Sequence, residues 1–385
     1  MLILFLLLSI TFLLCKIYAS EVFVYFVLTF LLGVFFHLLF SLEYASGSIN
    51  YFNSDEIAYT RLREEFFDYT EYKFRALWYF LNEMSYLTSG NHHTFANKLL
   101  ALPFVMLFQL VIYLGFDKNK NFILLPILSP YLIYLGTMDL RDTFIFLLCA
   151  FSLYTFINKN YKSLISGLLL LMFLRPFAVI LIVFSIILLL AFNKNVMILR
   201  QKIIYLLAIS MLTIIAYFQF YEIFASYIFR IETFLNLSNP TSLQGEPIDT
   251  SIFGIGTYIA KWIFSPSPSS LLLRVIEDGG HAVFGVTDDV VRILHQSIYY
   301  LCLFYTSLNF SYFYTGLISG FRFLSSKANA FYQLLFYFIV LWSFIYIIFT
   351  LGASHSRVKI IVTIFVVITA LCVFTEKRLA YVQRK

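Results

Sequence analysis

The chain contains a series of apolar runs, each close to the length needed to cross a bilayer. A membrane-spanning helix needs about 20 apolar residues. Such runs lie near residues 2–19, 22–42, 99–116, 122–137, 143–157, 203–224, 296–321, 330–351 and 360–375. Hydrophobic residues make up 61% of the 385 positions and charged residues 12%, which is too little polar surface for a water-soluble fold. The sequence therefore predicts an all-α polytopic membrane protein that forms a single integral membrane domain over residues 1–385.

A longer apolar stretch, from Ser163 to Phe192, is interrupted in its middle by Arg175 and Pro176. Proline breaks the hydrogen-bond ladder of a helix, and an arginine buried in lipid is costly. Short cytoplasmic loops are enriched in Lys and Arg. Three basic loops flank this stretch; they contain Lys118 and Lys120, Lys159 and Lys162, and Lys194, Arg200 and Lys202. All three can face the cytoplasm only if the chain crosses twice between the second and the third. We therefore expect two short helices with Arg175 in an outer turn, in preference to one kinked helix.

The same charge rule orients the rest of the chain. It predicts about 11 transmembrane helices, a periplasmic N-terminus and a basic cytoplasmic tail over residues 376–385. Two long segments, 43–98 and 225–295, then fall on the periplasmic face as outer loops. Apolar residues at helical spacing predict amphipathic surface helices in the first loop. Prolines and glycines predict an irregular loop over a cavity in the second.

The first outer loop carries two adjacent carboxylates, Asp55 and Glu56. One interpretation is structural, because Asn53 and Glu56 have the spacing of a pair that caps a helix. The other is chemical, because a carboxylate at the membrane surface can take the proton from a sugar hydroxyl that attacks a lipid-linked donor. Both interpretations stay open from the residues alone.

Three arginines lie in the turns that the topology places on the outer face. Arg141 precedes Asp142, Arg175 precedes a proline, and Arg357 follows His355 closely. A guanidinium group holds a phosphate through two parallel hydrogen bonds and can stabilise it as it departs. Any one of these arginines can instead be ion-paired or reach to the membrane interface. Their shared side nevertheless predicts a diphosphate-binding site.

Several short motifs occur in an order that resembles bacterial membrane glycosyltransferases of the GT-C type. Asp55, Glu56 and Tyr59 resemble the acidic DExxY motif of that group. Four further segments carry the resemblance: Ser129 and Pro130, Leu140 to Asp142, Leu174 to Pro176, and His355 to Ile360. It implies a GT-C-like helical architecture in which Asp55 is placed to act as the base. From the residues themselves, we expect Asp55 or Glu56 to be catalytic and Arg141, Arg175 and Arg357 to bind the substrate diphosphate. Tyr59, Asp142 and His355 would support them.

The segment from Phe264 to Pro268 resembles instead the proline-containing outer loop of Wzy-type polymerases, which join the repeat units of O-antigen or capsular polysaccharide. This resemblance favours a polymerase in the bacterial inner membrane. It implies an undecaprenyl-diphosphate-linked oligosaccharide as substrate and a chain-length regulator as partner, with lipid around the chain and no required cofactor or metal.

Two other functions remain as alternatives. One is a GT-C transferase that adds a single sugar from a polyprenyl-phosphate donor, for which a divalent metal is an option. The other is a flippase or transporter of lipid-linked glycan, which would place its charges near the middle of the membrane. The net charge of +6 comes from short clusters between apolar runs, a pattern that orients helices, so we expect no nucleic-acid partner.

Overall fold

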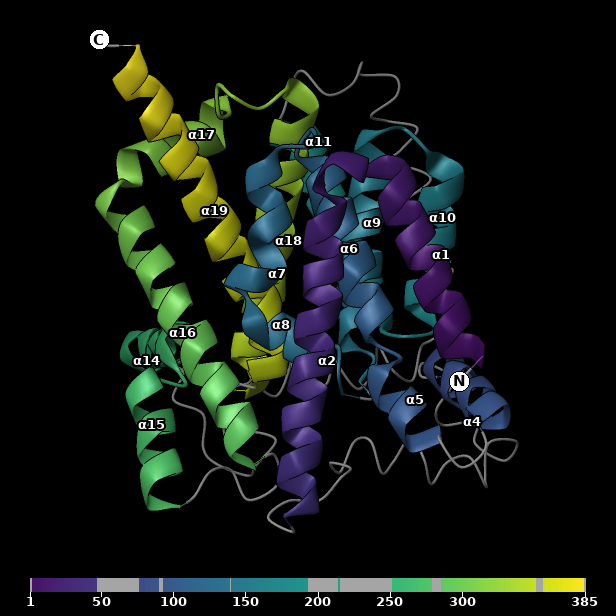
Figure 1. Cartoon of the computed structure of the whole chain (residues 1–385). Coiled ribbons are helices and arrows are strands. Elements are labelled where there is room, and N and C mark those ends of the chain that lie inside the picture. The colour runs from purple at the N-terminus through teal and green to yellow at the C-terminus, as the bar shows by residue number, and fades with distance from the viewer. Residues whose placement is uncertain are drawn as a thin grey trace.

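A computed structural model gives the fold of residues 2–46, 76–89, 93–138, 140–192, 214, 251–278, 285–350 and 356–383. Every regular element in these ranges is helical (Figure 1). The first half contains α1 (Leu2–Tyr18), α2 (Phe23–Ala45), α4 (Ala76–Ser89), α5 (His93–Leu99), α6 (Leu102–Gly115), α7 (Leu125–Leu128), α8 (Pro130–Leu135), α9 (Asp142–Ile157), α10 (Tyr161–Met172) and α11 (Pro176–Phe192). The second half contains α14 (Ile252–Phe264), α15 (Pro268–Glu277), α16 (Gly285–Leu308), α17 (Phe310–Ser319), α18 (Ser326–Thr350) and α19 (Ser356–Val382). Short 3-10 helices, η1 (Ser20–Val22) and η4 (Lys120–Leu124), complete the described elements.

The protein is a helical membrane protein. Within the described ranges, four stretches are long and apolar enough to cross a membrane: Ser20–Ala45, Ala96–Gly115, Ser326–Ile347 and Lys359–Val382. Shorter apolar helices accompany them: Leu2–Tyr18, Asp142–Ile157, Tyr161–Met172 and Pro176–Phe192. The all-α class predicted from the apolar runs is therefore confirmed. The run over residues 203–224 lies outside the described residues, apart from the single helical position 214.

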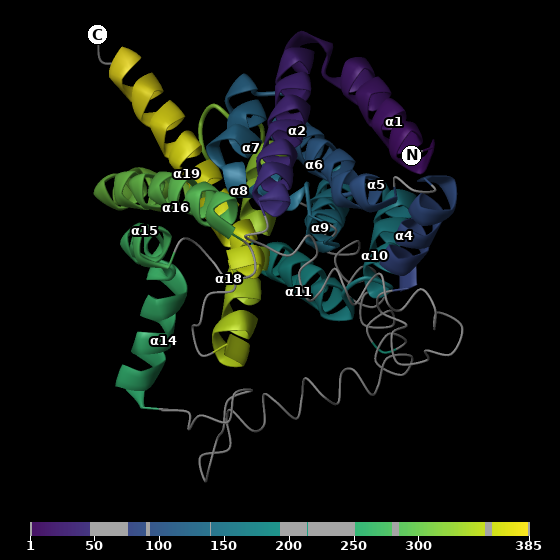
Figure 2. The same cartoon turned by 60° about the horizontal axis from the view of Figure 1, so that its bottom comes forward.

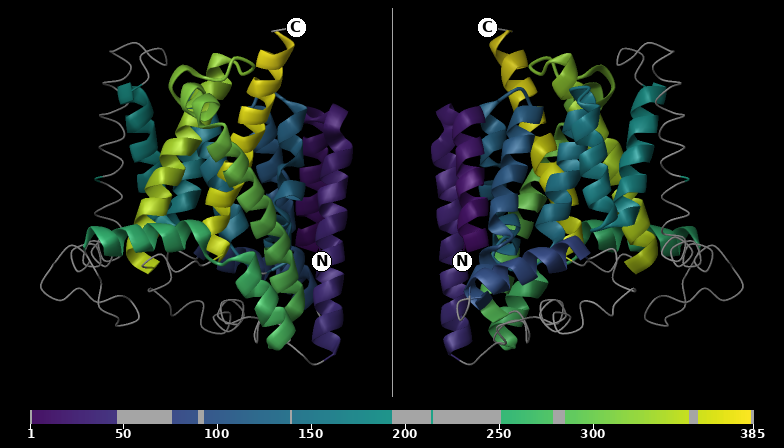
Figure 3. Two further views of the ribbon diagram at one scale, coloured as in Figure 1. Left: turned by 90° about the vertical axis from the view of Figure 1, so that its left-hand side faces the viewer. Right: turned by 90° about the vertical axis from the view of Figure 1, so that its right-hand side faces the viewer.

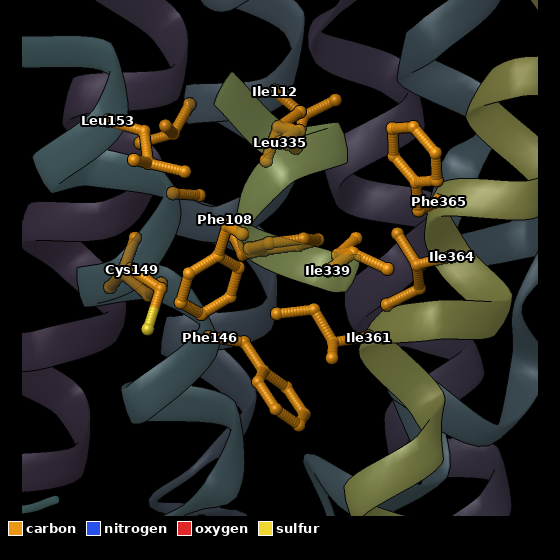
Figure 4. Close-up of a cluster of buried hydrophobic side chains, with 14 of the residues drawn as sticks. Phe108, Ile112, Phe146, Cys149, Leu153, Leu335, Ile339, Ile361, Ile364 and Phe365 are labelled. Carbon is orange, nitrogen blue, oxygen red and sulfur yellow. The ribbon is translucent and has the colours of Figure 1, made fainter. Parts of the chain in front are cut away.

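The centre of the bundle is an apolar core shared by α6, α9, α18 and α19. Figure 4 shows side chains of all four helices converging there, with Phe108 of α6 near Cys149 of α9. Buried Leu335 and Ile339 from α18 and Ile361 from α19 fill the opposite side. Few polar groups lie in this region. Because lipid tails are as apolar as these side chains, close packing is what holds the four helices together here.

A close approach between two of these helices occurs at Gly115, near the end of α6. A Cβ atom at this position would overlap the ring of Phe331 on α18. Only glycine fits at such a contact without displacing the ring, because it has no side chain beyond a hydrogen. In contrast, Gly256 on α14 has no other heavy atom near the position of a Cβ.

The prediction of two short helices around Arg175 is confirmed. The chain leaves α10 at Met172, passes through a turn that contains Arg175, and enters α11 at Pro176. Proline at the first position of a helix loses no hydrogen bond, because that N–H has no partner within the helix. The turn lies at the end of the bundle where α9 also begins, since Arg175 pairs there with Asp142.

Two predicted spans differ from single helices. The run over 122–137 is divided into η4, α7 and α8, with the last break at Ser129 and Pro130. The run over 296–321 belongs to two helices, because α16 begins at Gly285 and ends at Leu308, and α17 follows after Asn309. Charged residues near the start of α16 lower the hydropathy there, so the apolar run begins later in the sequence than the helix does.

The prediction of an irregular second outer loop is wrong for its described part. Residues 252–264 and 268–277 form α14 and α15, and the prolines between them separate two helices without preventing either. Pro268 occupies the first position of α15, where proline is favoured, and Ser267 caps the same helix by accepting the N–H of Ser270. α14 runs across the axes of the long helices at one end of the bundle (Figure 3), and α15 packs beside α16.

In the segment predicted as the first outer loop, the described part is also helical. α4 covers the predicted apolar stretch from Leu77 to Met84. Its Trp78 is fully buried and packs against Phe104 of α6 and Phe144 of α9. The residues of this loop before position 76 lie outside the described part, so the predicted surface helix around Tyr59 stays a prediction.

Candidate functional site at the α14 end of the bundle

Arg175 is the centre of a cluster at the end of the bundle where α14 lies, which we call the α14 end. Its guanidinium group donates a hydrogen bond to the hydroxyl of Tyr346 on α18. The Nη1 atom lies 3.6 Å from Oδ1 of Asp142, in the first turn of α9. The Arg175 side chain stays 19% exposed, and that of Asp142 13%. The arginine is therefore held by Tyr346 and Asp142, and part of its side chain stays accessible to solvent.

Aromatic rings surround this guanidinium group. The Cζ atom lies 5.1 Å from the ring centroid of Phe177, 5.7 Å from that of Tyr346 and 6.0 Å from that of Trp342. Such contacts stabilise a cation electrostatically. Trp342 and Tyr346 are both buried, so the rings also fix the plane of the arginine.

Arg141 serves the same turn from the neighbouring helix. Its Nη1 atom donates a 2.8 Å hydrogen bond to the carbonyl oxygen of Leu174, the residue before Arg175. The side chain is almost fully buried. This contact ties the start of α9 to the α10–α11 turn, and it places Arg141 as a support of Arg175.

α14 contributes the next layer of contacts. Trp262 stacks on Tyr346, with ring centroids 6.1 Å apart and an angle of 7° between the planes. Trp262 is 2% exposed, and its Nε1 atom has no hydrogen-bond partner among the described residues. Phe253 and Ile259 of the same helix are exposed. This pattern, with one buried and one exposed apolar face, is typical of a helix at a membrane interface.

Lys359, in the first turn of α19, holds the C-terminal end of α14, next to Trp262. Its Nζ atom donates to the carbonyl oxygen of Ile263 at 2.7 Å and to that of Ser265 at 2.8 Å. It also lies 4.9 Å from the ring centroid of Tyr299. The lysine is fully buried, and no carboxylate pairs with it in the part of the chain that the structure describes.

A second polar cluster lines α16 beside this lysine. Arg292 lies 2.7 Å from Asp288, one turn earlier on the same helix, and 5.2 Å from the ring centroid of Tyr131 on α8. Asp289 pairs with Arg274 of α15 at 3.5 Å. Both carboxylates are fully buried, so these pairs explain how charged residues fit inside a helix bundle.

His295 lies one turn further along α16. Its Nε2 atom is 2.7 Å from Oγ1 of Thr363 on α19, and the ring is buried. The ring is therefore held by a hydrogen bond with the threonine between α16 and α19. No group of three metal-ligating side chains forms in the described ranges.

The structure thus brings Arg141, Asp142 and Arg175 together, as their predicted common side required. Arg357 lies in the first turn of α19, at the same end of that helix as Lys359. The remaining predicted site residues, Asp55, Glu56, Tyr59 and His355, lie outside the described residues. Their roles, and the diphosphate-binding role of the three arginines, stay predictions.

Sequence reasoning missed two members of the cluster, Tyr346 and Lys359. Tyr346 is one of 28 tyrosines, and nothing in the chain marks its pairing with an arginine 171 positions away. Lys359 did carry a signal, because a lysine directly before the apolar run over 360–375 is an ionisable group at the edge of a membrane helix.

Comparison with known proteins adds no assignment: no protein family matches the sequence, and neither a curated protein nor a solved structure is significantly similar to it.

Proposed function

We propose that this protein is a membrane-embedded glycosyltransferase that acts on undecaprenyl-diphosphate-linked glycans and polymerises the repeat units of a surface polysaccharide. The observation that carries the proposal is Arg175. It is a partly exposed arginine, oriented by Tyr346 and Asp142 and surrounded by aromatic rings, at the end of a membrane bundle. Such a group suits the diphosphate of a lipid-linked substrate, whose headgroup lies at the membrane surface.

In the proposed reaction, a hydroxyl oxygen of the acceptor repeat unit attacks the anomeric carbon of the donor glycan. A bond forms between these atoms, and the bond from the anomeric carbon to the diphosphate oxygen breaks. Asp55 or Glu56 takes the hydroxyl proton. Arg175 and Arg357 stabilise the negative charge that develops on the leaving diphosphate, and Arg141 supports them. Tyr59, Asp142 and His355 assist these groups.

The proposal includes a topology. The chain would cross the bacterial inner membrane about 11 times in a GT-C-like arrangement, with a periplasmic N-terminus and a cytoplasmic C-terminus. The α14 end would then face the periplasm. The amphipathic α14, which lies at the edge of the bundle beside α15 (Figure 2), is typical of a membrane–water interface and supports placing this end of the bundle at one. The distribution of basic loops then assigns this interface to the periplasm.

A transporter or flippase of lipid-linked glycan is the second candidate, and one specific observation favours it. Asp288, Asp289 and Lys359 are fully buried between helices and Arg292 is half-buried, whereas the sequence places the candidate arginines in outer turns. The adjoining break at Ser129 and Pro130 also resembles the interrupted helices of transport proteins. Arg175 favours the transferase, because this partly exposed arginine lies at one end of the bundle, whereas a transporter would place its charges near the middle of the membrane.

Chemical analysis of surface glycan from a deletion strain separates the candidates. We expect loss of long polysaccharide chains, with single repeat units retained. Loss of one side-branch sugar would instead indicate a single-sugar GT-C transferase. Loss of all exported glycan would indicate a flippase and overturn the proposal.

Complementation of the same strain tests the proposed base. Asp55→Asn and Glu56→Gln should each be made, because the two carboxylates are adjacent. We expect at least one of them to reduce long chains strongly at unchanged membrane abundance. If both variants restore full-length glycan, the helix-capping interpretation of these residues is sufficient and the base must lie elsewhere.

A further inference from the structure

The C-terminal end of α14 is held by side chains from two other helices. Lys359 of α19 donates to the carbonyl oxygens of Ile263 and Ser265. Tyr299 of α16 donates to the same Ile263 carbonyl at 3.2 Å, and Tyr300 donates to that of Phe264. The last carbonyls of a helix have no partner within it. Here neighbouring helices supply the donors, so this end of α14 has a fixed position.

Lys359 contributes most to this attachment. It is the one cation among the three donors, and cations stabilise the negative end of a helix dipole. A fully buried ammonium group costs several kcal/mol unless its hydrogens are bonded. The two carbonyl bonds and the Tyr299 ring meet that requirement. Removing the lysine would therefore release the helix end more than removing either hydroxyl.

The position of this helix end determines the position of Trp262. Trp262 directly precedes Ile263, stacks on Tyr346 and is buried, whereas Phe253 near the start of α14 is 88% exposed. The buried face of α14 runs through Tyr258 and Trp262, and the hydrogen bonds that other helices donate to its backbone lie at the C-terminal end. Tyr346, in turn, accepts the hydrogen bond from Arg175. A short path of contacts therefore leads from Lys359 to Arg175.

We infer that Lys359 is a positioning residue for Arg175, acting through the end of α14 and the stacked pair of Trp262 and Tyr346. One consequence rests on the proposed function: by holding Arg175 in place, Lys359 sets the affinity of the site for a diphosphate. Lys359 itself touches no ligand in this arrangement. Its effect is to keep Tyr346 in place, so that the guanidinium group keeps one orientation.

The test measures the exposure of Arg175 directly. Full-length protein in nanodiscs is treated with phenylglyoxal, which modifies free guanidinium groups, and mass spectrometry follows the peptide that contains Arg175. In Lys359→Met we expect modification to be about tenfold faster, the change that corresponds to about 1.4 kcal/mol in the equilibrium that frees the arginine. Lys359→Arg, which retains donors and charge, should remain close to the unaltered protein. Lys261→Met is the matched control, because Lys261 is an exposed lysine on α14, directly before Trp262.

Two further variants follow the path beyond the lysine. Trp262→Leu removes the stack without touching Lys359 and should also accelerate modification. In the double variant Lys359→Met with Tyr346→Phe, the effects should not add, because both act on one path. Trp262→Leu also serves if Lys359→Met does not fold.

Unchanged modification of Arg175 in Lys359→Met, or in Trp262→Leu where the first variant is unstable, overturns the inference. Equal acceleration by Lys261→Met does the same, because it indicates general loosening of α14. Binding of inorganic pyrophosphate to the same samples separates this inference from the proposed function. Faster modification with weaker pyrophosphate binding supports both, whereas faster modification of a protein that never binds pyrophosphate supports the contact path and contradicts the proposed function.

Discussion

Replacing Asp142 by asparagine removes the carboxylate that neutralises Arg175 while preserving the size of the side chain. At the observed separation of 3.6 Å, an effective dielectric constant near 20 gives a gross attraction of about 4.6 kcal/mol. Desolvation and solvent screening offset most of this, and partly exposed pairs typically retain about 1 kcal/mol. An anionic ligand no longer competes with the carboxylate in Asp142→Asn. We therefore expect this variant to bind pyrophosphate roughly fivefold more tightly than the unaltered protein.

Isothermal titration calorimetry of purified protein with inorganic pyrophosphate measures this change. Arg175→Gln is the matched control and should abolish binding, alone or combined with Asp142→Asn. The gain in pyrophosphate affinity of Asp142→Asn should become smaller as the salt concentration is raised, because mobile ions screen charges in a partly exposed site. Unchanged or weaker binding by Asp142→Asn at low salt would refute the reasoning, since it would mean that the orientation of Arg175 by Asp142 outweighs the competition between the carboxylate and the anion.

Three other predictions address catalysis, packing and topology. Arg357→Lys keeps the charge but loses the paired donors of a guanidinium group, so turnover of lipid-linked glycan in vitro should fall on the order of a hundredfold; near-normal turnover would leave Arg357 as a helix-end anchor. Gly115→Ala should destabilise the protein by roughly 1–3 kcal/mol in detergent unfolding, whereas Gly256→Ala should be neutral or slightly stabilising; equal effects would contradict the packing argument. A cysteine at position 175 should react with a membrane-impermeant reagent from the periplasmic side and one at Lys194 only from the cytoplasmic side; the reverse pattern would invert the topology.

The features that sequence reasoning located correctly are those fixed by local chemistry and by the bilayer. Long apolar runs identified α1, α2, α6, α9, α18 and α19, because lipid requires continuous apolar helices. The turn at Arg175 followed from two facts that agree, a helix-breaking proline and the distribution of basic loops.

The features that it missed depend on partners distant in the chain. Asp288 and Arg292 neutralise one another within α16, so the first part of this helix, which hydropathy assigns to a loop, packs among other helices. Pro268 occupies the first turn of α15, where proline is favoured. The same residue in the interior of a helix would break it, and the sequence alone does not show where the helix begins. The contact of Lys359 with Ile263 joins residues 96 positions apart, and one sequence contains no record of such a pairing.

The central position of α6 has a consequence for how the chain is made. Its side chains, Phe108 among them, complete their packing only against α18 and α19, which the ribosome delivers after more than half of the sequence has been inserted (Figure 4). During that interval, α6 must lie beside lipid, a chaperone or the insertion machinery at a surface that later becomes interior. A chain that stops before α18 therefore leaves an unfilled apolar seam along the side of α6 that α18 and α19 cover in the complete bundle.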